Sequence, residues 1–336
     1  MKIADLQKQV DKLPRIKMAQ LPTPLEEMPR LSKVLGGPKL WIKRDDLTGI
    51  AFGGNKERKI EFVMADAIKK GADVIITTGA IQSNHARVTA AAAKKLGLKV
   101  VLVMRGKEPE RYDGNLLLDN LFGADIRFVQ MDPQQALSEM EKVAVELKNK
   151  GHSPYTVPGG ASYPTGAVGY VNAMLELINQ AKERMPNINY VIHAAGSGGT
   201  QAGLVITNKA LETETEILGM CIKSKANQWL AEKIVEIANG IRRLLDLKAV
   251  AEQKDVVLIS DYAGEDYGVL TPEAVEAIKL VARTEGILLD PVYTSKAMAG
   301  LIDFIRQRRF KKDDNVIFIH TGGTPGLFVY KEQLRT

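Results

Sequence analysis

Short apolar runs rich in valine and isoleucine alternate with amphipathic helical patterns along most of this chain. The runs predict buried strands at residues 73–78, 99–104, 125–129, 190–195, 216–222, 256–260 and 315–320. Apolar residues three or four positions apart predict helices at residues 85–96, 113–122, 133–149, 200–211, 228–245 and 272–285. Repeated strand–helix–strand units form parallel sheets that helices cover on both faces, so we expect an α/β fold.

A glycine-rich segment near residues 151–169 separates two series of these units. A chain of 336 residues is also long enough to form two cores. We therefore expect two lobes, each an open and mostly parallel sheet flanked by helices. A ligand is expected in the cleft between the lobes.

The net charge of +6 comes from 46 lysine and arginine residues against 40 aspartate and glutamate residues. The basic residues are scattered, which disfavours nucleic acid as a partner. Two stretches without these charged residues, 152–175 and 185–208, are broken by glycine, proline, asparagine and serine, so neither is expected to span a membrane. The start of the chain lacks the apolar segment of a secretion signal. We expect a soluble, cytoplasmic protein.

Cys221 is the only cysteine, which excludes an intramolecular disulfide and a multi-cysteine metal site. It belongs to the apolar run 217–222, which is one of the predicted buried strands. The thiol is therefore expected to be an inert core group rather than a nucleophile. We expect no bound metal.

Polar loops follow several predicted strands, at the edge where open α/β sheets bind ligands. After the strand at 73–78, Ser83 and Asn84 stand where a helix N-cap belongs. They either only cap the helix or form a carboxylate site together with the amides of its first turn. After the last strand, Thr321 is placed to present a neutral hydroxyl to the cleft.

The loop after residues 190–195 has the composition of an anion site. In Gly196-Ser197-Gly198-Gly199-Thr200, the glycines permit close approach to the backbone and two hydroxyls add hydrogen-bond donors. A dinucleotide fingerprint would need glycine at Gln201, and a nucleotide phosphate loop would need lysine at Leu204. A site for a phosphate without a nucleotide, or a plain tight turn, remains.

Lys56 follows two glycines and an asparagine at the start of another helical pattern, which also carries Arg58 and Lys59. A lysine near other cations at a helix N-terminus has a lowered pKa, and its amine is therefore more available. Most lysines are solvated surface residues, so the spacing makes Lys56 a candidate without proving a role.

Taken together, these motifs resemble those of the 1-aminocyclopropane-1-carboxylate deaminase and D-cysteine desulfhydrase branch of fold-type II pyridoxal-phosphate enzymes, which also includes L-cysteate sulfo-lyases. The likeness covers nearly the whole chain, and its motifs are Lys43–Gly49, Gly53–Lys56 with Arg58 and Lys59, Gln82–His85, Gly196–Thr200, Leu289–Tyr293 and His320–Gly323. The resemblance implies a fold like that of the tryptophan synthase β subunit and a homodimer. We expect a large cofactor-binding domain at 1–48 and 163–336 and a small domain at 49–162.

The resemblance also implies how pyridoxal 5′-phosphate is held. Lys56 would carry the cofactor as a Schiff base and would later move the Cα proton of the substrate. Lys59 and the loop Gly196–Thr200 would bind the cofactor phosphate. Asn84 would bind its 3′-oxygen, and Thr321 would lie beside the ring.

A second set of residues is implied for the substrate, a small amino acid. Ser83 would receive the substrate carboxylate with its neighbours Asn84 and His85. Tyr267 and Tyr293 would line the substrate side. A proton donor for the leaving group is needed, and one of these two tyrosines is our candidate.

Two threonines bear on the reaction within this branch. The deaminases carry glutamate at the place of Thr294, as well as leucine at the place of Thr321, whereas both threonines match the D-cysteine desulfhydrases. A carboxylate near the pyridine nitrogen would keep that nitrogen protonated and make the ring a stronger electron sink, which opening a cyclopropane needs. A ring with a neutral hydroxyl at this place is a weaker electron sink, but it is sufficient when the leaving group is as good as a thiolate. The expected reaction is β-elimination from D-cysteine to pyruvate, hydrogen sulfide and ammonia.

Three other readings stay open. L-Cysteate is one alternative substrate, with sulfite as the leaving group. The cyclopropane amino acid, giving 2-oxobutyrate and ammonia, is another. The last is a binding protein that captures a small phosphorylated ligand without turnover, although such a protein would have no need of Lys56.

Overall fold

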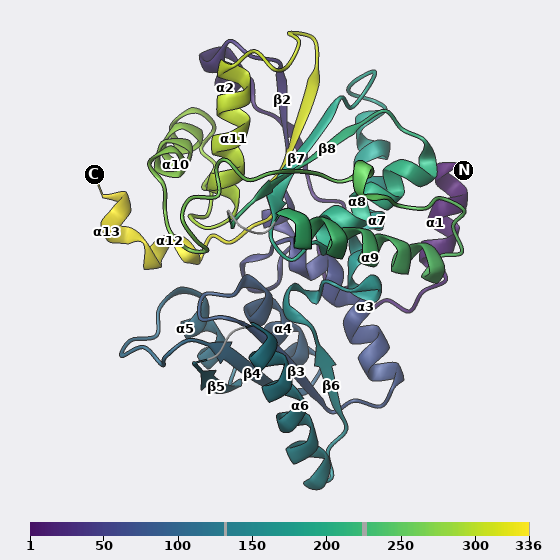
Figure 1. Cartoon of the computed structure of the whole chain (residues 1–336), viewed down its shortest axis with the longest axis vertical. Helices are drawn as coiled ribbons and strands as arrows, with labels where there is room; N and C mark the ends of the chain where they lie inside the picture. Colours follow the sequence, from purple (N-terminus) through teal and green to yellow (C-terminus); the bar gives the residue numbers. More distant parts are fainter. Residues whose placement is uncertain (131–132, 224–226, 336) are drawn as a thin grey trace.

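The computed structural model describes residues 1–130, 133–223 and 227–335, and its strands form two separate sheets (Figure 1). The larger sheet has the strand order β1 (Leu25–Glu27), β2 (Lys39–Lys43), β10 (Asn315–Ile319), β7 (Tyr190–Ala195), β8 (Glu216–Cys221) and β9 (Val257–Ile259). The smaller sheet has the order β5 (Asp125–Val129), β4 (Lys99–Arg105), β3 (Val74–Ala80) and β6 (Pro154–Val157). Neighbouring strands are parallel except β1, which pairs antiparallel with β2. The predicted α/β fold with two mostly parallel sheets is confirmed.

Successive residues of a strand point to opposite faces of the sheet, and in the larger sheet the side chains on both faces are mostly apolar. Helices therefore cover both faces. Ile317 belongs to a core with helices α1 (Ile3–Asp11), α7 (Pro164–Ala181), α8 (Gly199–Leu211) and α9 (Asn227–Leu244). Its neighbour Phe318 belongs to a core on the other face, with α2 (Pro29–Leu35), α10 (Pro272–Glu285) and α11 (Thr294–Arg306). The short helices α12 (Gly326–Val329) and α13 (Lys331–Leu334) follow the last strand.

The smaller sheet is built in the same way. Ile75 packs with α3 (Asn55–Lys69) and α4 (Asn84–Lys95), whereas Ile76 packs with α6 (Pro133–Asn149) on the opposite face. Helix α5 (Gly114–Leu121) lies between β4 and β5 in the chain and contacts both α4 and α12. Helix α3 also packs against α7, so it belongs to the contact between the two halves of the molecule (Figure 1).

The predicted strands and helices all occur, with ends shifted by at most two residues. The alternating pattern did not predict β1, β2, β6, α1, α2, α7 or α11. Helix α7 is the largest omission, and it begins inside the glycine-rich segment that was expected to separate the lobes. The proposed domain boundaries, at 48/49 and 162/163, lie between secondary-structure elements and stay a prediction.

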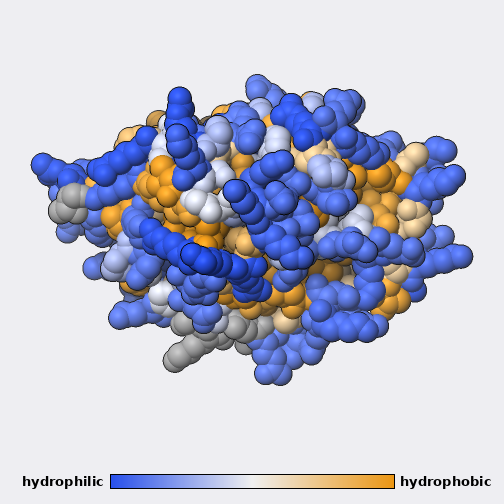
Figure 2. All heavy atoms as spheres, turned by 90° about the horizontal axis from the view of Figure 1, so that it is seen from above, coloured by the Kyte–Doolittle hydropathy of each residue, from blue (hydrophilic) through white to orange (hydrophobic). Residues whose placement is uncertain are grey.

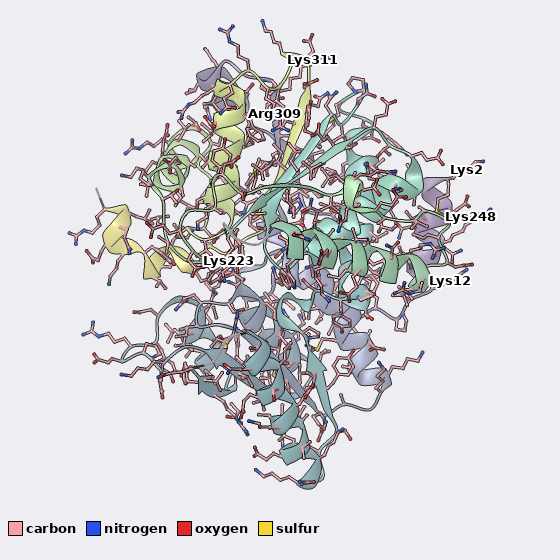
Figure 3. All side chains as sticks on the ribbon, in the orientation of Figure 1. Lys2, Lys12, Lys223, Lys248, Arg309 and Lys311 are labelled. Atoms are coloured by element: carbon pink, nitrogen blue, oxygen red, sulfur yellow. The ribbon has the colours of Figure 1, made fainter. Side chains whose placement is uncertain are left out.

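The face seen in Figure 2 is mostly hydrophilic, with scattered groups of hydrophobic residues. Figure 3 labels six cationic side chains, with Arg309 and Lys311 at one end of the molecule and Lys2, Lys12 and Lys248 at the side where α1 is drawn. Within the described ranges, no helix has the length and apolar character needed to cross a membrane. Cys221 lies in β8 with its side chain buried, as predicted, and burial raises the pKa of its thiol to about 11.

Candidate active site

Lys56 lies in the first turn of α3, directly after a loop with unusual backbone geometry. Gly49, Ala51, Phe52, Gly53 and Gly54 all have positive φ angles. The loop is closed by Thr48, whose Oγ1 accepts the Gly54 N–H at 2.7 Å. A loop closed so tightly at its base fixes the direction from which the chain enters α3.

The Lys56 amine is partly buried at the junction of the two sheets. Its Nζ donates to Asn55 Oδ1 at 2.9 Å and lies 6.0 Å from the centre of the Tyr293 ring. Loss of hydration and the positive charge of Arg87 lower the pKa of Lys56 to about 8, although the negative charge of Asp290 opposes them. The expected direction of the shift, toward an available free amine, is therefore confirmed.

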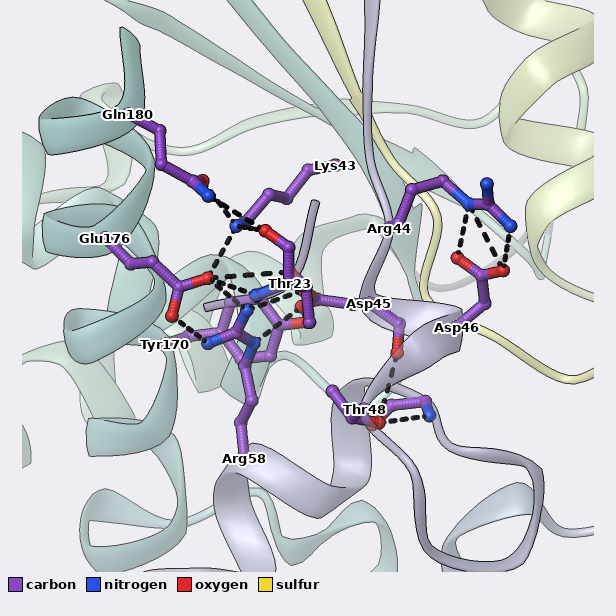
Figure 4. Close-up of polar contacts among 11 residues, drawn as sticks. Thr23, Lys43, Arg44, Asp45, Asp46, Thr48, Arg58, Tyr170, Glu176 and Gln180 are labelled. Carbon is purple, nitrogen blue, oxygen red and sulfur yellow. Dashed lines mark hydrogen bonds and ion pairs between the residues drawn. The ribbon is translucent and has the colours of Figure 1, made fainter. Parts of the chain in front are cut away.

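A buried ionic network holds α3 in place (Figure 4). Arg58, two residues after Lys56, donates to Asp45 and to Glu176, each at 2.8 Å. Lys43 donates to Glu176 at 2.5 Å, and the Tyr170 hydroxyl donates to Asp45 at 2.6 Å. Two cations and two carboxylates balance, which is the condition under which buried charges are tolerated. The network ties α3 to β2 and α7, and so holds the backbone of Lys56.

Lys59 lies one turn after Asn55 and is wholly buried. Its amine contacts only neutral groups, Gly160 O at 3.3 Å and Ser162 Oγ at 3.4 Å, and no carboxylate of the described residues lies within 4.0 Å of it. Burial, and then the charge of Lys56, lower the pKa of Lys59 well below its usual value. A buried amine without a counter-ion is the environment that an anionic ligand would complete.

The predicted anion loop meets Lys59. A methyl group added at Gly199 would come within 2.8 Å of Lys59 Nζ. Ser162 connects the two, because its Oγ accepts the Gly199 N–H at 3.3 Å and lies 2.6 Å from Ser197 Oγ. At the other end of the loop, Thr200 Oγ1 accepts a hydrogen bond from the Asn55 amide at 3.0 Å. Glycines, hydroxyls and one lysine therefore converge at the N-terminus of α8.

Ser83 is the N-cap of α4, and its Oγ accepts the Ala86 N–H at 3.1 Å. The capping interpretation is therefore confirmed, and a carboxylate site at the same position stays a prediction. The expected role of His85 receives less support from the geometry. Its ring nitrogens lie 2.8 Å from Thr77 Oγ1 of β3 and 3.4 Å from Thr89 Oγ1 of α4, so neighbouring hydroxyls already engage both.

Asn84 is held from two sides. Its Oδ1 accepts hydrogen bonds from Arg87 at 3.1 Å and from Asn115 at 2.8 Å. Its amide nitrogen would lie 2.9 Å from a methyl group added at Gly323, and Asp290 approaches the same glycine. Asn84 from the smaller sheet thus meets the loop that follows β10 of the larger sheet.

Asp290 organises the start of α11. Its two carboxylate oxygens accept the N–H groups of Val292, Tyr293 and Thr294 at 2.7–3.0 Å. The Thr294 hydroxyl, wholly buried, donates to Asp290 at 2.7 Å. The hydrogen bond makes Thr294 part of a helix cap, and its expected contact with substrate stays a prediction. The Tyr293 hydroxyl lies 2.8 Å from that of Tyr267.

Thr321 joins the last loop to the Lys56 segment through its backbone. Its carbonyl accepts the Asn55 N–H at 3.0 Å. A methyl group at Gly54 would lie 3.1 Å from the same carbonyl, and one at Gly322 would lie 2.7 Å from Gly54 Cα. The two loops therefore touch backbone to backbone, which explains the glycines in both.

The structure thus brings the predicted residues from five separate segments to the surroundings of Lys56. Four residues at this site were given no role from the sequence: Arg87, Asn115, Ser162 and Asp290. Asp290 belongs to the motif Leu289–Tyr293, so the sequence contained a sign of its importance. Arg87 looked like an ordinary basic residue of a helix, and only the fold shows that its guanidinium is buried.

Comparison with known proteins gives a consistent picture. Residues 16–322 match the family described as pyridoxal-phosphate dependent enzymes. A solved structure of an ACC deaminase homologue is 38% identical, covers 98% of each chain and has a TM-score of 0.90. A pyridoxal 5′-phosphate-dependent aspartate racemase (17% identity, 96% of this chain and 95% of that one, TM-score 0.69) shares the fold. The processed form of threonine deaminase isoform 2 from Solanum lycopersicum also shares the fold (19% identity, 99% of this chain and 86% of that one, TM-score 0.68).

Proposed function

Because this chain belongs to the family of pyridoxal-phosphate dependent enzymes, we propose that it catalyses β-elimination on a small sulfur amino acid, with D-cysteine as the preferred substrate. D-Cysteine and water would give pyruvate, hydrogen sulfide and ammonia. The observation that carries the reaction class is the Lys56 amine, partly buried with a pKa near 8 and facing a tyrosine pair.

The residues present fit the cofactor. Lys59 is a buried amine with no counter-ion among the described residues, and the amides and hydroxyls from Gly196 to Thr200 surround it; these groups would hold the phosphate. Lys56 would hold the aldehyde carbon, and Asn84 would bind the ring oxygen. When bound, the cofactor supplies an electron-withdrawing ring that stabilises negative charge at the substrate Cα.

The side chains of this chain would then divide the proton transfers. Lys56 takes the proton from Cα, a step that requires the neutral amine, and its lowered pKa enlarges the neutral fraction. Ser83 and the first amides of α4 hold the substrate carboxylate at a helix N-terminus. The tyrosine pair donates the proton that the leaving sulfur takes up. Burial raises the pKa of Tyr267 to about 12, so this hydroxyl stays protonated at neutral pH.

The choice of D-cysteine depends on Thr294 and Thr321, which stand where the deaminases of the branch carry glutamate and leucine. Thr294 is wholly buried and is hydrogen-bonded to Asp290, so this position offers the ring no carboxylate of its own. A neutral hydroxyl at this position suits a good leaving group such as thiolate. The 38% identity to an ACC deaminase homologue supports the cyclopropane substrate as an alternative.

One observation favours L-cysteate as a second candidate. Arg105, at the end of β4, makes no hydrogen bond or ion pair with the residues that the structure describes, and its Nε is buried. Burial raises the pKa of Tyr267 and Tyr293, and the positive charge of Arg105 opposes this at both residues. A cation that has no partner among the described residues and whose charge acts on both tyrosines would suit a sulfonate.

The test is a parallel assay of the purified enzyme with D-cysteine, L-cysteine, L-cysteate and 1-aminocyclopropane-1-carboxylate. Sulfide, sulfite and 2-oxobutyrate are distinguishable products. We expect sulfide from D-cysteine at the highest kcat/KM. Release of 2-oxobutyrate or sulfite at a higher kcat/KM would replace the proposal with the corresponding alternative.

The variant Lys56→Ala tests the reaction class. It should lose turnover and the cofactor absorbance, whereas Lys69→Ala, at the exposed end of the same helix, should keep both. Unchanged absorbance and turnover in Lys56→Ala would show that another residue holds the cofactor.

A further inference from the structure

Arg87 is wholly buried where the two halves of the site meet. Its guanidinium donates to Gly53 O at 2.7 Å, to Asn115 Oδ1 at 2.8 Å and to Asn84 Oδ1 at 3.1 Å. Gly53 lies three residues before Lys56, and Asn84 is the residue proposed to bind the cofactor ring. One side chain therefore joins the strained loop that carries Lys56 to the start of α4.

The charge of Arg87 is balanced at a distance rather than by contact. Among the carboxylates that act on it, Asp119 of α5 acts most strongly, yet no ion pair forms between them in the described structure. Asp119 is wholly buried, and neither of its oxygens has a hydrogen-bond partner among the described residues. Asn115 and Asp119 are four residues apart, so α5 presents both toward α4. The contact with Asn115 therefore also places Asp119 near the guanidinium.

The protonation of these groups is coupled. Burial raises the pKa of Asp119 to about 8, and the positive charge of Arg87 opposes this shift. Burial lowers the pKa of Arg87 to about 10, and this shift is opposed by the carboxylates of Asp119, Asp290 and Glu57. Arg87 is thus a cation at neutral pH. Burial and then Arg87 lower the pKa of Lys56.

His85, the other titratable group at the start of α4, does not share this coupling at neutral pH. Burial, followed by the charges of Lys56 and Lys59, keeps the pKa of His85 well below 6.5. The imidazole is therefore neutral under the conditions in which Lys56 titrates. Arg87 is then the cation on α4 that acts on the Lys56 amine.

We propose that Arg87 is a positioning residue, which fixes the Lys56 loop against Asn84 and whose positive charge favours the neutral, reactive form of the Lys56 amine. Where the Asp119 carboxyl is ionised, above its pKa of about 8, it offsets that charge from α5. The inference rests on the proposed role of Lys56. Packing alone would make Arg87 matter for stability, but it would leave the acid–base behaviour of Lys56 unchanged.

The test measures how apoenzyme captures pyridoxal 5′-phosphate, followed by the absorbance that appears on mixing at a series of pH values. The rate should rise with pH up to a midpoint set by Lys56. In Arg87→Met the midpoint should move up by about one unit, because a like charge near the amine is removed. Capture at pH 7 would then be about tenfold slower. Arg87→Lys keeps the cation and loses the planar donor group, so its midpoint should stay while capture slows at every pH.

An unchanged midpoint in Arg87→Met, or an equal upward shift in Arg87→Lys, would overturn the proposal. Asp119→Asn provides the second test, and it decides the question if Arg87→Met does not fold. Asp119 is partly ionised near the Lys56 midpoint, so without it the charge of Arg87 is less balanced there, and the midpoint should move down by up to about half a unit. An unchanged or raised midpoint would contradict the proposal.

Lys56→Ala separates this inference from the proposed function. If Lys56→Ala captures the cofactor as fast as the wild type does, the role of Lys56 is wrong and the inference fails with it. If Lys56→Ala shows no absorbance change on mixing with the cofactor and the midpoint of Arg87→Met equals that of the wild type, only the inference fails.

Discussion

The hydroxyl groups of Tyr267 and Tyr293 lie 2.8 Å apart, and their rings meet edge to face with centroids 5.9 Å apart. Tyr293 precedes α11 and lies under the Lys56 amine, whereas Tyr267 comes from the loop before α10. Burial raises the pKa of both tyrosines, so both hydroxyls stay protonated at neutral pH and either could donate a proton.

Tyr293 faces the Lys56 amine, so we expect its partner Tyr267 to donate the proton to the leaving group. Tyr267→Phe should lower kcat for D-cysteine by about 100-fold, the usual size of a general-acid contribution. With β-chloro-D-alanine, whose chloride leaves without a proton, the same variant should lose less than about threefold. Steady-state assays of both substrates check this. Equal losses on the two substrates would mean that Tyr267 only shapes the site.

The sequence predicted the parallel strands well because each of them is a short apolar run between polar loops. Helix α7 escaped prediction for a related reason. Its residues Ala167, Val168, Val171 and Leu175 are buried against several neighbours, so the helix lacks the polar face that periodicity detects. Strands β1 and β6 have only three or four residues, too few to show alternation.

At the site, loops with glycine and hydroxyl residues were predictable because close backbone approach demands those residue types. Arg87, Asp290 and Ser162 were not, because a buried arginine, a capping aspartate and a bridging serine look ordinary in sequence. Their roles depend on which segments meet in three dimensions. The position of Lys59 beside Gly199 was likewise not predictable, because the two residues are 140 positions apart in the chain and only the fold brings them together.

The ionic network below α3 should dominate the stability of this region. Asp45→Asn removes one carboxylate and leaves Arg58 short of a partner, so the free energy of unfolding should fall by about 3–5 kcal/mol. Glu332→Gln, which removes an exposed partner of Arg335, should change it by less than about 1 kcal/mol. Urea unfolding of both variants measures the difference. Similar losses would show that the buried network adds little.

This prediction has a defined pH dependence. Burial opposes ionisation of Asp45, but Arg58 and Lys43 outweigh it and hold the pKa of the carboxyl below 3.8. A lowered pKa stabilises the fold above pH 3.8, and the contribution is lost as the pH falls through the folded-state value. The difference between wild type and Asp45→Asn should therefore shrink in acid.

Lys59 should act on the cofactor phosphate alone. Lys59→Met keeps the length of the side chain and removes its donors, so the affinity of the apoenzyme for pyridoxal 5′-phosphate should fall by about 10- to 100-fold. Affinity for pyridoxal, which lacks the phosphate, should change by less than about threefold. Absorbance titrations with the two aldehydes check this. An equal loss for both would place Lys59 away from the phosphate.

The last prediction concerns Gly199, the residue of the anion loop that approaches Lys59. A methyl group at Gly199 would lie 2.8 Å from both Lys59 Nζ and Ser162 Oγ, and 3.0 Å from Ser162 Cα. Gly199 has no positive φ angle, so Gly199→Ala puts little strain on the backbone and mainly fills the space beside Lys59. We expect cofactor affinity to fall at least about tenfold, the cost of displacing one charged hydrogen bond.

Gly286→Ala is the matched control for this variant. Gly286 ends α10 with φ 69° and open space around its Cα, so alanine there should lower the free energy of unfolding by about 1 kcal/mol and leave cofactor affinity unchanged. Apoenzyme titration and thermal unfolding together separate the two effects. If Gly199→Ala bound the cofactor as tightly as wild type, the anion would have to lie elsewhere than beside Lys59, and the phosphate site would need to be placed at another helix N-terminus.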